Sequence, residues 1–209
     1  MINKLENIVE KPIAQIIFAH GAGADMYHEF METITALFNK ANISVLRFNF
    51  SYMDKRIALG KLIECYKTVI HDFIATKNNH ELPIFIGGKS MGSRVAATLA
   101  GEDDISKLIQ GVFCLGYPFH PPKKIDKLRL EPLQDTHKPI LIAQGERDTL
   151  GSKIEINDYD ISKLCQCFFL IDGDHSLKPR VKSGFTHQQH MESAVDAVVC
   201  FILENINNE

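Results

Sequence analysis

The sequence lacks any apolar run long enough to cross a membrane and any block of like charges. A spanning helix needs about 20 consecutive apolar residues, and no segment approaches that length. The formal net charge of −3 leaves no basic field to attract nucleic acid. The densest basic cluster (Lys123, Lys124, Lys127 and Arg129) is interrupted by Asp126 and is predicted to be a solvated loop. We therefore expect neither a membrane protein nor a nucleic-acid-binding protein.

The cysteines are few and odd in number. There are five of them, Cys65, Cys114, Cys165, Cys167 and Cys200, mostly within apolar segments, which favours reduced, buried thiols over a disulfide framework. The pair Cys165 and Cys167 could be a redox or metal pair, but no second C-x-C or C-x-x-C accompanies it. The first residues, MINKLENIVEKP, carry scattered charges and no apolar signal-peptide core. These features predict a cytosolic protein.

Motifs for cofactors are also missing. The sequence has no H-E-x-x-H, no Walker loop and no G-x-G-x-x-G that opens a helix after a strand. The segment DGDH (172–175) has no further ligands at recognisable spacing, and HGAGAD (20–25) only superficially resembles a nucleotide loop. We predict neither a metal nor an organic cofactor.

Apolar, β-branched segments alternate along the chain with helical patterns. The predicted strands span 13–19, 43–50, 82–88, 108–116, 139–145 and 165–172. Several are almost continuously hydrophobic, which is typical of parallel strands buried on both faces. Helical spacing of apolar residues covers 27–40, 55–76 and 187–206, and Thr186 is a candidate N-cap for the last segment.

This alternation predicts an α/β fold. We expect a mostly parallel central sheet with helices on both faces, forming one domain over residues 1–209. The longest stretch without periodicity, 117–138, is rich in proline and charge and is predicted to be a functional loop or a lid.

The segment GKSMG (88–92) fits the pattern G-x-S-x-G and lies between a predicted strand and a predicted helix. In a strand–turn–helix elbow, side chains at Gly88 and Gly92 would collide with neighbouring elements. The turn would project the Ser90 hydroxyl above the sheet, at the positive end of the helix. Ser90 is thus a candidate nucleophile, the alternative being a small residue in a glycine-rich turn.

A serine nucleophile needs a general base and a third group that orients the base. Asp148 directly follows the strand 139–145, and His175 directly follows the strand 165–172. Both positions lie where parallel strands end and where α/β sheets assemble their sites, in the chain order serine, acid, histidine. Two alternatives remain for the acid: Asp148 could cap a helix near Ser152, and Glu146 lies in the same loop.

Other acidic and histidine residues near this candidate triad are predicted to have structural or solvated positions rather than catalytic roles. Asp172 and Asp174 are too close in sequence to His175 to be its acid partner and are predicted to shape its turn. His187 and His190 begin the last predicted helix and are expected to be solvated.

Acyl transfer also needs donors aimed at the developing oxyanion. One candidate is the amide of Met91, and the other is the amide of Ala22 or Gly23, in the loop after the first long strand. We take Ala22 and Met91 as the oxyanion hole, and we expect His20 to anchor the loop.

Five residues follow strands at the same predicted edge of the sheet. We expect them to line the substrate pocket, although packing within a rigid loop is an equal alternative. They are Tyr27, His28, Tyr52, Phe119 and His120.

Six segments together resemble a known family. They are AHGAGADM, RFNFSYM, GGKSMGSR, LGYPFHPP, QGERDTLG and DGDHSL. They resemble a small α/β-hydrolase family that includes testis-expressed protein 30 and the hydrolase-like domain of nonspecific-lethal complex subunit 3, and that is related to the dienelactone hydrolases. The resemblance implies a minimal α/β-hydrolase fold without a large lid, with Ser90 as nucleophile, Asp148 as acid and His175 as base.

The chain departs from this family at Ser93, where glycine is common. Dienelactone hydrolases themselves use a cysteine nucleophile, so their substrate does not transfer to a chain with Ser90.

These observations predict a serine hydrolase that cleaves an ester, thioester or similar acyl bond of a small-molecule substrate. The alternatives are a hydrolase-fold binding or assembly module with little catalysis, and acyl transfer to an acceptor other than water. An exposed edge strand could pair two copies as a homodimer.

Overall fold

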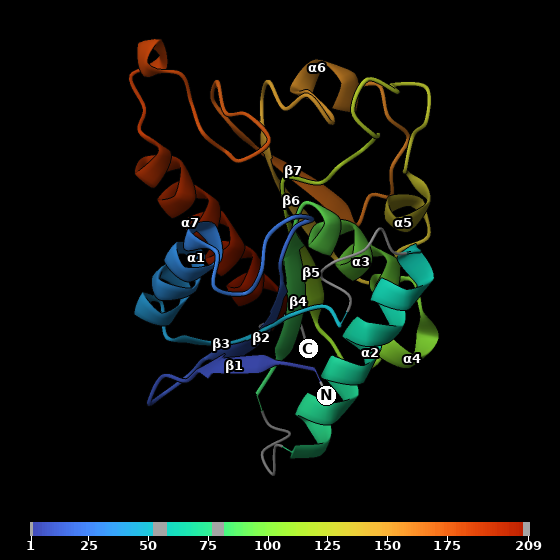
Figure 1. Ribbon diagram of the computed structural model, residues 1–209, viewed down its shortest axis with the longest axis vertical. Helices are drawn as coiled ribbons and strands as arrows, with labels where there is room; N and C mark the ends of the chain where they lie inside the picture. The colour runs from blue at the N-terminus through green and yellow to red at the C-terminus, as the bar shows by residue number, and fades with distance from the viewer. Residues whose placement is uncertain (1, 52–57, 77–81, 207–209) are drawn as a thin grey trace.

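The computed structural model describes residues 2–51, 58–76 and 82–206 of the chain. Its centre is a seven-stranded sheet with the order β1-β3-β2-β4-β5-β6-β7 (Figure 1). The strands are β1 (Lys4–Asn7), β2 (Ala14–Ala19), β3 (Ile43–Phe48), β4 (Ile84–Lys89), β5 (Gly111–Leu115), β6 (Ile140–Gly145) and β7 (Cys165–Leu170). From β3 to β7 every neighbouring pair is parallel, while β1 runs antiparallel to β3.

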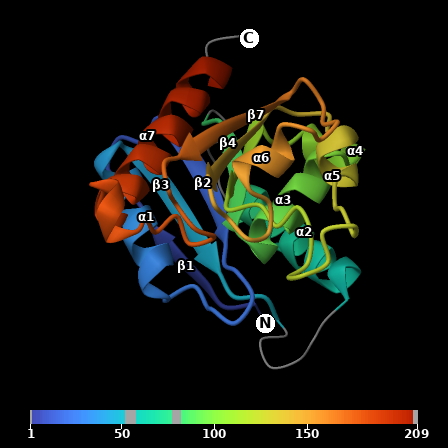
Figure 2. The ribbon, with the colours of Figure 1, turned by 90° about the horizontal axis from the view of Figure 1, so that it is seen from above.

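Helices cover both faces of this sheet. They are α1 (Glu29–Lys40), α2 (Leu59–Thr76), α3 (Met91–Ala100), α4 (Asp103–Ser106), α5 (Glu131–Gln134), α6 (Lys153–Ile156) and α7 (His187–Ile206), with a short 3-10 helix η1 (Val181–Ser183). Figure 2 shows α1 and α7 on one side of the sheet and α2 and α3 on the other. The α/β-hydrolase architecture predicted from the sequence is therefore confirmed.

All six predicted strands are present and slightly shorter than predicted, although β4 ends one residue later, at Lys89. Strand β1 was missed because its sequence, KLEN, has no apolar run, and its residues alternate between exposed and half-buried. It forms by pairing with β3, placing Lys4 opposite Phe48. This long-range contact leaves no local pattern in the sequence.

The core has two parts, one on each face of the sheet. The part under α2 and α3 contains the stripe predicted for 55–76, with Tyr66 and Val69 fully buried. The part under α1 and α7 contains Phe38 and Val198, also fully buried. Strands such as β2 and β6 are buried along their whole length. Burial on both faces explains their continuous hydrophobicity.

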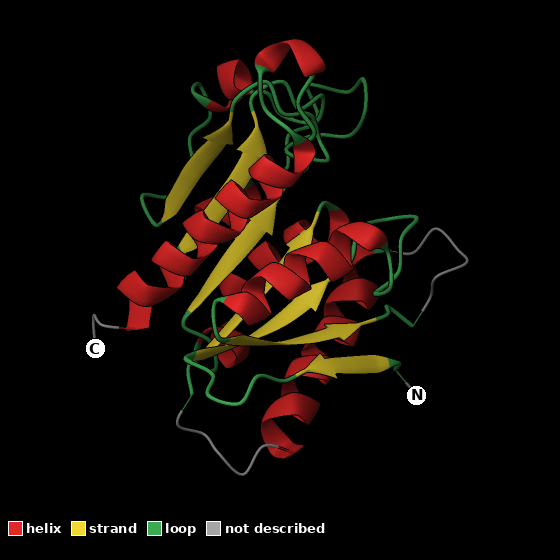
Figure 3. Ribbon diagram, turned by 90° about the vertical axis from the view of Figure 1, so that its left-hand side faces the viewer, coloured by secondary structure: helices red, strands yellow, loops and turns green. Residues whose placement is uncertain are grey.

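The carboxyl ends of β2 to β7 point to one edge of the sheet, where the longer loops gather (Figure 3). The stretch 117–138 begins at this edge, directly after β5, and returns through α5 to the opposite edge, where the parallel strand β6 begins. It is anchored rather than lid-like, because Tyr117, Phe119 and Leu133 are fully buried. Across the described ranges, no separate domain is inserted between the strands.

The cysteines and the helices bear on two expectations from composition. Cys65 and Cys114 are buried free thiols as predicted, whereas Cys165 and Cys167 on β7 are half-buried and Cys200 on α7 is exposed. The expected burial therefore holds only in part. No helix within the described residues combines the length and apolar character needed to cross a bilayer. Strand β7 ends the strand order, but pairing of two copies through it stays a prediction.

Candidate active site

Ser90 occupies the turn between β4 and α3. Its backbone has φ 53° and ψ −109°, a conformation that L-residues rarely adopt and that stores strain. The turn is held from both sides, because the Ser90 amide donates to the Leu115 carbonyl at 3.1 Å and the Ser90 carbonyl accepts from the Arg94 amide at 3.1 Å. The predicted elbow between strand and helix is present.

The two glycines of the pentapeptide allow close approach of backbone. A Cβ at Gly88 would lie 2.2 Å from the carbonyl carbon of Gly92, and a Cβ at Gly92 would lie 2.5 Å from the carbonyl oxygen of Ala19. Real Cβ atoms essentially never come so close. The collisions expected from the sequence are therefore specific. A side chain at Gly88 would collide with the start of α3, and a side chain at Gly92 would collide with the end of β2.

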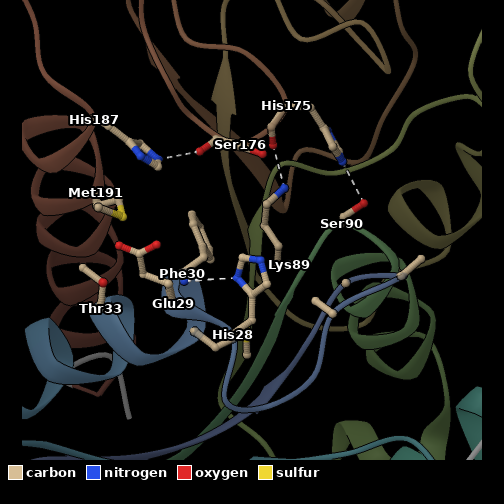
Figure 4. A pocket seen from close by; sticks show the side chains of 14 residues that line it. His28, Glu29, Phe30, Thr33, Lys89, Ser90, His175, Ser176, His187 and Met191 are labelled. Atoms are coloured by element: carbon tan, nitrogen blue, oxygen red, sulfur yellow. Dashed lines mark hydrogen bonds between the residues drawn. The ribbon is translucent and has the colours of Figure 1, made fainter. Parts of the chain in front are cut away.

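The three residues predicted for a triad meet at this elbow. His175 Nε2 lies 2.7 Å from Ser90 Oγ (Figure 4), and His175 Nδ1 lies 2.7 Å from Asp148 Oδ2. The Asp148 side chain is completely buried, whereas a quarter of the His175 side chain is exposed. This chain of hydrogen bonds fits a tautomer in which Nδ1–H donates to the carboxylate, leaving Nε2 to accept from the serine hydroxyl.

Asp148 is fixed by several donors. Its Oδ1 accepts from the Leu150 amide at 2.8 Å, and its Oδ2 accepts from Gln144 Nε2 at 2.8 Å. Gln144 is fully buried on β6, and its Oε1 accepts from the Tyr117 amide at 2.8 Å. Gln144 was not among the residues predicted from the sequence. The available signal was a lone amide side chain in an otherwise apolar strand, PILIAQG.

Replacing Gln144 by leucine should weaken both the fold and the site. The Tyr117 amide would lose its buried acceptor, which costs about 1–3 kcal/mol in the free energy of unfolding. Asp148 would also be less firmly held, so kcat for ester hydrolysis should fall. Urea unfolding and kcat measurements would check this, with the exposed Gln134→Leu as matched control. Wild-type values for both quantities in Gln144→Leu would contradict this role.

The competing interpretations of the acid do not fit the geometry. Glu146 turns away from the histidine: its Oε1 accepts from Lys153 Nζ at 2.9 Å and its Oε2 from the Asp172 amide at 3.2 Å. The cap of α6 is Ser152, which forms a capping box with Glu155. Asp148 therefore faces His175 and also stabilises its own turn.

The loop that carries His175 is shaped by its acidic residues, as predicted. Asp174 Oδ1 accepts from the amides of Ser176 and Lys178 at 2.8 and 2.9 Å. Asp172 forms an ion pair with Arg180, and this hydrogen-bonded guanidinium holds the pKa of the Asp172 carboxyl well below its usual range.

The expectation for the first turn of α7 was wrong in part. His190 is buried, and its Nδ1 lies 2.8 Å from the Leu177 carbonyl oxygen. His187 Nε2 donates to the Ser176 carbonyl at 2.9 Å. The loop before α7 folds back over the helix start, a long-range contact that the position of a histidine in a first turn does not reveal. The predicted N-cap is confirmed, since Thr186 Oγ1 accepts from the Gln189 amide at 3.2 Å.

The loop after β2 runs directly beside the elbow. A Cβ at Gly21 would lie 3.5 Å from Ser90 Cβ, which puts the Gly21–Ala22 backbone against the hydroxyl-bearing residue. His20 anchors this loop as predicted, because its Nδ1 donates to the Gly21 carbonyl at 2.8 Å and its Nε2 accepts from the Phe50 amide at 3.2 Å. Burial lowers the pKa of His20, which favours this neutral ring. Met91 is the first residue of α3, where amides have no partner within the helix.

A cavity of about 380 Å³ opens in front of Ser90. It lies between the loop after β2, the elbow, the His175 loop and the first turns of α1 and α7 (Figure 4). His28 lines it, as predicted, whereas Tyr27 is exposed and is not part of its wall. In the described part of the chain, no group of three or more His, Cys, Asp or Glu side chains is arranged to hold a metal ion.

The remaining pocket predictions need correction. Phe119 is fully buried, packs on Tyr117 and Tyr159, and fills space left by Gly151, where a Cβ would lie 2.5 Å from its ring. His120 is buried beside Glu155, 3.3 Å from its carboxylate. Their loop turns toward α6 and away from Ser90, so neither residue lines the cavity. Tyr52 lies outside the described residues.

A family model described as an alpha/beta hydrolase domain matches residues 12–203. The narrower family suggested by the motifs stays a prediction. Among solved structures, the chain is similar to Est1E from Butyrivibrio proteoclasticus with bound ferulic acid, with a TM-score of 0.75, 15% identity, and coverage of 98% of this chain and 95% of that one.

Two further solved structures are similar to the chain. One is the esterase Pf2001 of Pyrococcus furiosus, with a TM-score of 0.72, 19% identity, and coverage of 98% of this chain and 92% of that one. The other is a dienelactone hydrolase from Anabaena variabilis, with a TM-score of 0.63, 18% identity, and coverage of 98% and 90%. At these identities the likeness establishes the fold.

Proposed function

The chain belongs to the alpha/beta hydrolase domain family, and on that premise we propose that it is a serine hydrolase that cleaves an ester, thioester or similar acyl bond. The observation that carries this proposal is the unbroken chain of hydrogen bonds from Ser90 through His175 to the buried Asp148, open to a cavity. Such an arrangement supplies a nucleophile, a base and an orienting acid in hydrogen-bond contact.

The proposed reaction has two stages. Ser90 Oγ attacks the carbonyl carbon while His175 Nε2 takes the hydroxyl proton, and Asp148 stabilises the imidazolium. The amides of Met91 and Ala22 bind the oxyanion of the tetrahedral intermediate, with the positive end of α3 behind them. His175 then protonates the departing alcohol or thiol, and a water molecule activated by the same histidine releases the acyl group.

The substrate proposed for this site is a small acyl compound. The cavity volume of about 380 Å³ lies at the lower end of the range of about 300–1,000 Å³ found for small-molecule pockets. Ethyl ferulate belongs in a first panel of esters, since Est1E binds ferulic acid. The free thiols fit a reducing compartment, so we also propose a cytosolic location.

Labelling with a fluorophosphonate probe tests the proposal. Wild-type protein should gain the mass of one phosphonyl group at pH 7, and Ser90→Ala should gain none, because only an activated serine displaces fluoride from the probe. Ser176→Ala is the matched control, since Ser176 lines the same cavity and the histidine beside it, His187, contacts its backbone carbonyl rather than its hydroxyl; it should label like wild type. Folded wild-type protein that stays unlabelled would overturn the proposal and favour a binding or assembly role.

A further inference from the structure

A lysine stands immediately beside the nucleophile and faces the cavity. Lys89 is the last residue of β4, directly before Ser90, and its side chain forms part of the cavity wall. Its Nζ donates to the His175 carbonyl at 2.6 Å and lies 5.7 Å from the centre of the Phe30 ring. In Figure 4 the ammonium group lies between Phe30 and the His175 backbone.

This ammonium group is only partly satisfied by the protein. It carries three donors, of which the His175 carbonyl takes one. Among the residues that the structure describes, no carboxylate forms an ion pair with it. The nearest acids act through space only, because Asp148 is bonded to His175 and Asp174 to backbone amides. Burial lowers the pKa of Lys89 to about 8, so it remains charged at neutral pH.

The other charged and titratable groups at the cavity do not neutralise Lys89. Glu29 is exposed and points toward Met191 and Thr33 in Figure 4. His28 Nδ1 accepts from the Phe30 amide at 3.2 Å, so the neutral ring carries its hydrogen on Nε2 and is itself a donor. His187 donates to the Ser176 carbonyl. Next to Ser90, the described part of the cavity wall thus presents donors and a cation that forms no ion pair.

We infer that Lys89 determines specificity by binding a carboxylate carried on the ester substrate. A half-buried cation without an ion-paired carboxylate is unfavourable, and a ligand carboxylate that reaches it forms charge-assisted hydrogen bonds that a neutral group cannot match. The inference rests on the proposed function and narrows it to esters whose acyl or alcohol part is an anion.

Three ethyl esters whose acyl chains each have six carbons test this inference. Monoethyl adipate carries a carboxylate at the far end, its terminal amide is a neutral analogue of the same shape, and ethyl 6-aminohexanoate carries an ammonium group. The monoethyl esters of succinic and glutaric acid vary the distance between the ester and the carboxylate. At pH 7 we expect kcat/KM to be about 10- to 100-fold higher for the carboxylate ester than for its amide. The ammonium ester should be the poorest substrate.

The same ratio should respond to the charge on Lys89. Lys89→Met should bring the carboxylate-to-amide ratio close to one, and Lys89→Arg should retain part of it. Lys182→Met, which removes an exposed charge from η1, is the matched control and should leave the ratio unchanged. In wild type the ratio should fall as the pH rises past about 8, because the ammonium loses its proton while the substrate carboxylate stays ionised. Both esters are cleaved by the same triad, so the pH dependence of the triad cancels in the carboxylate-to-amide ratio.

The outcomes separate this inference from the proposed function. A ratio near one in wild-type protein that still labels at Ser90 would overturn the inference alone. An equal loss for both esters in Lys89→Met would also overturn it, since Lys89 would then only position the His175 backbone. If no ester is hydrolysed, calorimetric titration of the wild-type protein and of Lys89→Met with adipate at pH 7 provides the test. Binding to wild type that is lost in Lys89→Met supports the inference. Equal binding to both proteins, or binding to neither, rejects it. If Lys89→Met does not fold, the pH dependence of the wild-type ratio provides the test.

Discussion

Ser90→Ala should lower kcat for ester hydrolysis by about 10⁶-fold, the scale of loss when a triad serine is removed. The reason is chemical: within the described residues, the hydroxyl that contacts His175 Nε2 is that of Ser90, with its Oγ at 2.7 Å. The variant should fold, since Ser90 lies in a turn held by backbone hydrogen bonds and its side chain is not part of the buried core. Initial rates with a p-nitrophenyl ester, at enzyme concentrations high enough to see slow turnover, would measure the loss.

The combination of Ser90→Ala with His175→Ala is the control for this measurement. Residues that act as one unit are strongly non-additive, so the double variant should be hardly slower than either single variant. A Ser90→Ala protein that retains more than about a hundredth of the wild-type kcat would contradict the assigned nucleophile, because the oxyanion hole and binding alone leave far less.

Asp148→Asn should lower kcat by about 10⁴-fold with little change in the shape of the site. Asp148 accepts hydrogen bonds from His175 Nδ1 and Gln144 Nε2 on the same oxygen. An amide at this position can donate to the imidazole Nδ1 and thereby place the imidazole hydrogen on Nε2. That tautomer cannot take the Ser90 proton. Single-turnover kinetics would show the loss in the acylation step.

Glu146→Gln provides the comparison for Asp148→Asn, because Glu146 is the other acid in the same loop. Its carboxylate contacts Lys153 and the Asp172 amide near the surface, and exposed ion pairs contribute less than about 1 kcal/mol. We expect near-normal kcat and a small loss of stability. If Glu146→Gln were instead the slower of the two variants, the assignment of the acid would be wrong.

Much of the fold could be predicted because its main elements leave local patterns. Strands such as β2 and β6 are buried on both faces and are therefore continuously apolar, and α2 and α7 bury stripes at helical spacing. Strand β1 left no such pattern, since it is short and half-exposed and depends on its partner β3. The burial of His190 was missed for the same reason, because it follows from a contact with the Leu177 carbonyl.

The three residues that meet at the elbow were predictable because the topology fixes their positions. Residues that directly follow parallel strands must meet at one edge of the sheet, so their places in the sequence nearly determine their places in space. Apart from His28, the pocket wall was not predicted, since the course of a loop beyond its first residues depends on packing. Phe119 follows β5 in the same way, yet its ring enters the space left by Gly151. Gln144 and Lys89 were missed because their partners, Tyr117 and the His175 carbonyl, are distant in the sequence.

The backbone of Ser90, at φ 53° and ψ −109°, has a consequence for how this chain can change over generations. Such a conformation costs about 1–3 kcal/mol for a residue with a side chain, and glycine would adopt it with little penalty. Mutation toward glycine at this position would therefore favour the folded state while removing the hydroxyl. A lineage with no use for the hydroxyl would gain stability by losing it, so a serine here lowers the stability of the fold and can contribute only through its chemistry.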